Sequence, residues 1–196
     1  MTRILGVPEK DAGLLGRFAY RFSRCRFGKV PEPMRVTAHH RNVLLGTGAM
    51  ELALDRSRLV DARLKKLAEM KVALVVGCEF RVDIGSMLGK GLGITDDQLR
   101  ALPRFRESAA FSPVEKLVLE YAEGMSGTPA AVPDRLFDEL RRYFDEAPLV
   151  ELTAVIAWEN HRARFNDALG MGYQGFSEGS SCLLPGNPRQ STSRRA

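Results

Sequence analysis

Hydrophobic residues recur along this chain at steps of three and four, the spacing that places side chains on one face of an α-helix. Four such stripes are clear and two are weaker, over residues 60–74, 114–125 and 136–144, from residue 152 onward, and near 12–27 and 36–54. No run of four or more residues alternates as a surface strand would. The pattern predicts an all-α protein, a helical domain of roughly six to eight helices.

Helix-start signals agree with these stripes. Ser112-Pro113-Val114-Glu115 and Thr95-Asp96-Asp97-Gln98 both have the form of a capping box, and the first places proline at the first helical position. The run "VALVV", residues 72–76, has strand-forming residues, but it continues the stripe that starts at Val60, so we interpret it as helix. Gly89, Gly91 and Gly93 predict the end of the following helix.

Length and charge favour one soluble domain. The chain has 196 residues, of which 44% are hydrophobic and 27% charged, as in ordinary globular proteins. Three arginines near the end supply three of the five net positive charges, leaving +2 for the rest. We therefore predict a single helical domain over residues 1–185, a disordered basic tail over 186–196, and no nucleic-acid partner.

The cysteines indicate a reducing compartment. Cys25, Cys78 and Cys182 are few, odd in number and far apart, which does not suit a disulfide framework. The first twenty residues carry charges throughout, and the longest apolar run, residues 72–78, is too short to span a bilayer. The expected location is cytoplasmic, without a membrane partner.

Cys78 is the candidate reactive group. If a helix begins there, Cys78, Arg81, Val82 and Gly85 lie along one face. The positive end of the helix dipole and the nearby guanidinium would favour the thiolate, the reactive form, although Glu79 opposes them. The alternative is that Cys78 is a small buried hydrophobe.

The surroundings of Cys78 resemble the carboxymuconolactone decarboxylase family, which includes the AhpD-like alkylhydroperoxidases. The stretch "RLKKLAEMKVALVVGCEFRVDIGSMLGKGLGITDDQLRAL" is similar to that family's helix, Cys-x-x-Cys turn, second helix and "GIT" helix start. The later segments "FSPVEKLVLEYAEGM" and "ELTAVIAWENHRARFNDALG" look like its following helices. The resemblance is strongest over residues 30–180, and it implies an AhpD-like fold, a homo-oligomer, no cofactor, and a cytoplasmic antioxidant oxidoreductase with peroxiredoxin activity.

The family's peroxidases use a relay of a glutamate, two cysteines and a histidine, and the resemblance carries over only the first cysteine, as Cys78. The second falls on Arg81, the histidine on Gly85 and the glutamate on Lys66, with Glu69 the nearest acid one turn away. Asp83, followed by Gly85 and Ser86, matches a subgroup of the family written Cys-x-x-Cys-x-Asp-x-Gly-Ser.

Loss of the second cysteine changes the expected chemistry. A dithiol peroxidase converts its sulfenic acid into a disulfide with the neighbouring thiol, and Arg81 cannot do this. Cys78 could still reduce a peroxide or another small electrophile as a single thiol, with an external thiol as reductant. The candidate catalytic residues are then Cys78, Arg81, Asp83 and Glu69. Whether Cys25 or Cys182 approaches Cys78 is not decided by the sequence.

The last helical stripe carries polar groups on its inward face. Continuing it from residue 152 reaches Glu159, Arg162 and Asn166, which either line a substrate pocket or form a satisfied internal network. Glu159 and Arg162 are spaced for an i,i+3 ion pair, which favours the network. Helical spacing places His161 beside Trp158 and Phe165, which favours a packed or interface histidine; the alternative is a substrate-binding residue or a general acid or base. No histidine has other ligands at metal spacing, so no metal site is expected.

The sequence is also compatible with two other functions. Arg81 and Arg162 could hold a small carboxylate in a decarboxylase-like enzyme, because arginine matches carboxylate geometry. Alternatively, the loss of three of four relay positions suits a non-catalytic binding protein on a degenerate enzyme scaffold.

Overall fold

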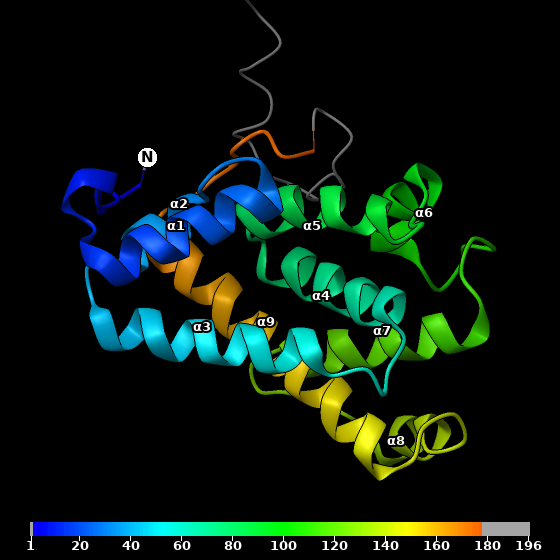
Figure 1. Cartoon of the computed structure of the whole chain (residues 1–196). Coiled ribbons are helices and arrows are strands. Elements are labelled where there is room, and N and C mark those ends of the chain that lie inside the picture. Colours follow the sequence, from blue (N-terminus) through cyan, green and yellow to red (C-terminus); the bar gives the residue numbers. More distant parts are fainter. Residues whose placement is uncertain (1, 178–196) are drawn as a thin grey trace, which may run out of the picture.

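The computed structural model describes residues 2–177, and that part of the chain is helical without a strand (Figure 1). Its elements are η1 (Glu9–Asp11), α1 (Gly13–Phe27), α2 (Glu32–Thr37), α3 (Arg41–Arg56), α4 (Ala62–Val76), α5 (Glu79–Gly91), α6 (Asp96–Ala101), η2 (Leu102–Arg104), α7 (Pro113–Ser126), α8 (Asp134–Leu140) and α9 (Glu146–Ala168). The predicted all-α class is confirmed. The described residues hold nine α-helices instead of six to eight, since α2 and α6 are too short to produce a stripe. The predicted basic tail lies outside the described residues.

Helix α4 forms the centre of the fold and packs most extensively against α7, α9 and α5. In Figure 1 it lies inside the ring of the other helices. Leu67, Ala68 and Met70 are at most 1% exposed. Even Lys71, on the same helix, is buried, and its ammonium lies 2.6 Å from Glu123. A helix with neighbours on several sides needs apolar residues on several faces, which explains why "VALVV" could be mistaken for a strand.

Both ends of α4 are fixed by local chemistry. The Asp61 side chain accepts hydrogen bonds from the backbone N–H groups of Arg63 (2.9 Å) and Leu64 (3.2 Å), which caps the first turn. At the other end Gly77 has φ +81°, a left-handed conformation that glycine adopts without steric cost. The chain therefore turns sharply after Val76, and α5 starts at Glu79 after only two intervening residues.

Helices α7 and α6 begin as the sequence predicts. Both capping boxes form: the side chains of Ser112 and Glu115 bond to each other's backbone at α7, and those of Thr95 and Gln98 do so at α6. The long helix α9 packs along α4, passes behind α3 in the view of Figure 1, and returns the chain to the vicinity of α1 and α2. This path brings the second half of α9 to the site around Cys78.

Helices α1 and α3 form an outer layer with little apolar burial. Only Leu44 is buried on α3, which is tied to α1 by the Arg26–Asp55 ion pair at 2.6 Å. On α1, Leu14 and Phe18 are 89% and 71% exposed. No helix in residues 2–177 combines the length and the apolar character that crossing a membrane requires.

Candidate functional site

Cys78 is the N-cap residue of α5, which confirms the predicted helix start. It is 1% exposed and lies in an apolar cluster with Phe80 and Ile84 from its own helix, Ala163 from α9, and Phe176 from the segment after α9. The thiol is thus placed by three separate parts of the chain. It lies at the positive end of a helix dipole but out of contact with bulk water.

Burial decides the protonation of this thiol. It raises the pKa of Cys78 from 9.0 to about 11, and the backbone N–H and guanidinium of Arg81 offset only part of that rise. Glu159 and Asp167 raise the pKa further. The prediction that helix start and arginine bias Cys78 toward thiolate is therefore wrong in its net direction. The local effects have the expected sign, but desolvation is larger.

Arg81 is occupied by a carboxylate of the chain itself. Its Nε and one terminal nitrogen donate to the two oxygens of Glu159, at 2.6 and 2.7 Å. The side chains are 10% and 1% exposed, so this is a buried bidentate pair. Because Glu159 neutralises the guanidinium, Arg81 has little charge left with which to stabilise a thiolate or bind a substrate acid.

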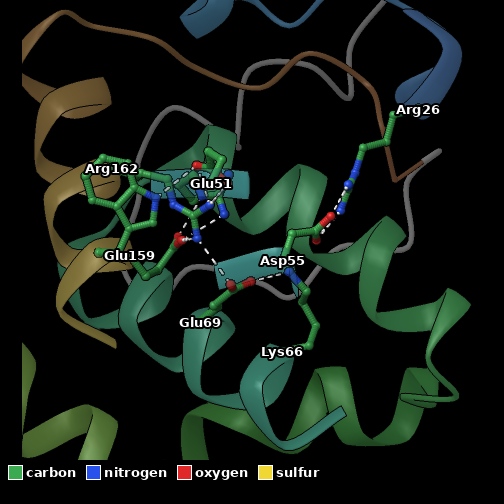
Figure 2. A network of polar contacts seen from close by, with 9 residues as sticks. Arg26, Glu51, Asp55, Lys66, Glu69, Glu159 and Arg162 are labelled. Carbon is green, nitrogen blue, oxygen red and sulfur yellow. Dashed lines mark hydrogen bonds and ion pairs between the residues drawn. The ribbon is translucent and has the colours of Figure 1, made fainter. Parts of the chain in front are cut away.

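Arg162 joins this pair to a wider network, drawn in Figure 2. It lies 2.5 Å from Glu159, the predicted i,i+3 ion pair, which is thereby confirmed. It also contacts Glu51 from α3 (2.7 Å) and Glu69 from α4 (3.2 Å). These carboxylates raise the pKa of Arg162 despite its burial. A substrate carboxylate would therefore have to displace the chain's own acids from both arginines, which leaves the decarboxylase-like hypothesis without structural support.

The family's glutamate position, Lys66, pairs with Glu69 in the same network. Burial raises the pKa of Glu69, but Lys66, Arg162 and Arg81 outweigh it and lower the pKa to about 2. A carboxylate held so firmly in its charged form is a weak base near neutral pH. Glu69 accordingly stabilises the network and is poorly suited to take a proton from Cys78.

Asp83 faces away from this network and holds the segment that follows α9. It is fully buried. Its carboxylate accepts hydrogen bonds from the backbone N–H groups of Gln174 (3.0 Å), Phe176 (3.0 Å) and Ser177 (2.8 Å), and from the Ser177 hydroxyl (2.8 Å). Asp83 was predicted among the catalytic residues, but these contacts give it an anchoring position.

The remaining predicted residues lie on α9 and α5. His161 stacks between Trp158, at 4.7 Å between ring centroids, and Phe165, at 6.1 Å, on an exposed face. Asn166 is 3% exposed, as its place on the inward stripe predicts. Gly85, at the family's histidine position, would bring an added Cβ within 3.4 Å of Met70, so a histidine ring would meet the core there.

Sequence reasoning missed the groups that come from distant segments. Glu51 accepts from the Trp158 indole (3.0 Å) as well as from Arg162, and Phe176 belongs to the apolar cluster around Cys78. The residues of each pair are more than ninety positions apart, and no local pattern in the sequence links positions at that distance. Of the other cysteines, Cys25 is free and exposed, and Cys182 lies outside the described residues.

Solved structures share this fold. The debrominase Bmp8 superposes with a TM-score of 0.81 and 21% identity, covering 92% of this chain and 96% of Bmp8. A cysteine-to-alanine variant of Bmp8 in complex with 2,3,4-tribromopyrrole matches equally well. A peroxidase-related protein with an alkylhydroperoxidase AhpD core, from Ralstonia eutropha JMP134, has a TM-score of 0.75 and 15% identity over 91% of this chain and 96% of its own. The AhpD-like fold predicted from the sequence is confirmed.

The chain also has sequence relatives and matches a protein family. The uncharacterized protein YnjA of Escherichia coli K12 is 40% identical over 133 residues, which is 67% of this chain and 70% of YnjA. YdfG of Bacillus subtilis 168, also uncharacterized, is 29% identical over 112 residues, or 57% of this chain and 76% of YdfG. Residues 44–124, from α3 to α7, match the carboxymuconolactone decarboxylase family, and the chain belongs to that family.

Proposed function

We propose that this protein is a thiol-dependent oxidoreductase in which Cys78 alone reduces a small electrophile, with an organic hydroperoxide as the first candidate. The observation that carries the proposal is the placement of Cys78 at the N-cap of α5, within an apolar cluster, in a chain of this family. A thiol at a helix N-terminus gains stabilisation of its anion once it is opened to water. Arg81, in the second cysteine's place, cannot form a disulfide with it.

The reaction balances with an external thiol. The Cys78 thiol attacks the hydroperoxide, the O–O bond breaks, and sulfenic acid and alcohol form. One external thiol then converts the sulfenic acid into a mixed disulfide and water, and a second releases Cys78 as a thiol together with the external disulfide. Two thiols are oxidised for each hydroperoxide reduced. A reducing cytoplasm would supply such thiols.

A brominated pyrrole is a second candidate substrate, favoured by the likeness to Bmp8. That protein is a debrominase, and its cysteine-to-alanine variant was solved with 2,3,4-tribromopyrrole. Replacing one bromine by hydrogen also consumes two electrons, so two external thiols would yield one disulfide, bromide and a proton. The overall electron demand is the same as for a hydroperoxide, and one assay format serves both.

The decisive measurement is turnover with substitution of Cys78. We expect the purified protein to consume cumene hydroperoxide or release bromide from tribromopyrrole with dithiothreitol as donor, and Cys78→Ser to abolish this. Cys25→Ser, which changes an exposed thiol, is the matched control and should retain activity. Absence of turnover on both substrates, or full activity of Cys78→Ser, would refute the proposal and favour a non-catalytic binding protein.

We also propose that the protein is a homo-oligomer. The apolar side chains Leu14, Phe18 and Phe22 follow one another at steps of four on α1 and are 89%, 71% and 52% exposed. Such a stripe is unfavourable in water, and a second copy of the chain could cover it.

A further inference from the structure

The segment from Gln174 to Ser177 contributes one side chain, Phe176, to the apolar surroundings of Cys78. Phe176 in this segment is 6% exposed and packs in the same apolar cluster as the thiol. Its ring meets that of Phe80 edge-on, with centroids 6.0 Å apart and an interplanar angle of 83°. Because Cys78 itself is only 1% exposed, a reagent reaches the sulfur only after some covering group moves.

The segment is fastened to the helix that carries the thiol. Asp83 lies five residues beyond Cys78 and accepts all four hydrogen bonds from Gln174, Phe176 and Ser177 described above. Three of the donors are backbone N–H groups of a segment without regular secondary structure, which otherwise lack partners in a helix or sheet. One buried carboxylate thus replaces the secondary structure that would hold this part of the chain in place.

A second fastening comes from Lys29 in the turn between α1 and α2 and from Glu32, the first residue of α2. The Lys29 ammonium donates to the Gln174 carbonyl and lies 4.0 Å from the centroid of the Phe176 ring. The Gln174 amide donates to the Glu32 carboxylate at 3.0 Å and accepts from the Glu32 backbone N–H at 3.2 Å. Water can replace each of these polar contacts when the segment lifts away.

The balance of forces favours opening of this segment alone. Phe176 is its single large buried apolar side chain, while the neighbouring Tyr173 is 52% exposed and Gly175 is exposed. Segments with few buried apolar contacts open at lower free energy than the helical core. The core around α4 buries many more apolar groups and does not need to open for the thiol to be uncovered.

We propose that Gln174–Ser177 is a strap that opens and closes over Cys78, and that Asp83 is the latch that sets how often the thiol is exposed. The latch is a positioning residue, since it acts on the thiol only through the strap. This inference rests on the proposed function, because the strap would regulate the same thiol that carries out the proposed reaction. Its test requires no turnover, so a protein that reduces neither substrate would refute the proposed function while leaving the strap to be judged separately.

The test measures alkylation of Cys78 by iodoacetamide, in the full chain with Cys25→Ser and Cys182→Ser. Phe176→Ala and Asp83→Asn should each raise the alkylation rate by roughly tenfold or more, because they remove the cover or weaken several charge-assisted hydrogen bonds. Tyr173→Ala, the matched loss of an exposed aromatic side chain beside the strap, should leave the rate within about twofold. If Asp83→Asn does not fold, the comparison of alkylation rates between Phe176→Ala and Tyr173→Ala still tests the proposal.

Urea separates strap opening from global unfolding. Alkylation through the strap should depend weakly on urea, since little surface is exposed, whereas global unfolding depends on it steeply. Leu136→Ala, in the core at α8 and outside the thiol's cluster, should lower global stability and leave alkylation in dilute buffer unchanged. The proposal is overturned if alkylation tracks global unfolding in every variant, or if Phe176→Ala and Asp83→Asn react no faster than Tyr173→Ala.

Discussion

Replacing Glu159 by glutamine tests whether the contribution of a carboxylate in this network to stability depends on its burial, and not only on the number of charges in the network. Glu159 is 1% exposed and binds both Arg81 and Arg162. Glutamine keeps the shape but leaves two largely buried guanidiniums without their shared anion. Removing one partner of a buried ion pair costs about 3–5 kcal/mol. Against a typical total of about 5–15 kcal/mol, this is a large part of the free energy of unfolding.

Glu51→Gln is the matched control because it removes the same charge from the same network. The six side chains Lys66, Arg81, Arg162, Glu51, Glu69 and Glu159 carry three charges of each sign, so either substitution leaves three cations and two anions. The Glu51 side chain, however, is 45% exposed, and water replaces much of what it provides. Its loss should cost under about 1 kcal/mol.

The assay is urea unfolding of both variants and the wild type at pH 7. We expect the midpoint of Glu159→Gln to fall much further than that of Glu51→Gln, with unchanged urea slopes. A double variant, Arg81→Met with Glu159→Leu, should recover part of the loss, since an apolar pair of similar size leaves fewer buried charges uncompensated. Equal costs for Glu159→Gln and Glu51→Gln would refute the reasoning, because burial would then not determine the contribution.

Two further predictions concern the thiol and the outer helix. Because the pKa of Cys78 is raised from 9.0 to about 11, the unfolded chain loses its thiol proton first, so the stabilisation present below pH 9 disappears as the pH rises toward 11. The wild type should lose about 2 kcal/mol more than Cys78→Ala between pH 8 and pH 10.5 in urea unfolding, and parallel pH profiles would contradict the raised pKa. For the oligomer, light scattering should give a mass above 21.7 kDa that Phe18→Asp shifts toward the single chain, while Leu59→Asp, equally apolar and 61% exposed but outside α1, should not. A monomeric wild type would refute that proposal.

Features encoded locally could be predicted, and features that depend on packing could not. The capping boxes at Ser112 and Thr95, the helix start at Cys78 and the Glu159–Arg162 pair all involve residues at most four positions apart, and all are present. Their physics is contained in a single helical turn. The local sequence is therefore sufficient to predict such features.

The pKa of Cys78 shows where that reasoning stops. The helix dipole and Arg81 are local and act in the predicted direction. Burial arises from Ala163 and Phe176, far along the chain, and it reverses the net result. In the same way Asp83 looked like a member of a catalytic motif until its partners, more than ninety residues away, made it an anchor. Partners at that distance are determined by the tertiary fold and leave no mark on local spacing.

The buried pair of Arg81 and Glu159 has a consequence for how this chain can change over evolutionary time. Restoring a Cys-x-x-Cys motif by Arg81→Cys alone would leave Glu159 beside Arg162 with half of its cationic partners gone, in a place that is 1% exposed. A second thiol would then arrive together with a loss of stability, unless position 159 changed as well. Because the two side chains, 78 residues apart, form one buried ion pair, we expect substitutions at positions 81 and 159 to have non-additive effects on stability. A dithiol site engineered at positions 78 and 81 should therefore be more stable when position 159 is changed together with position 81.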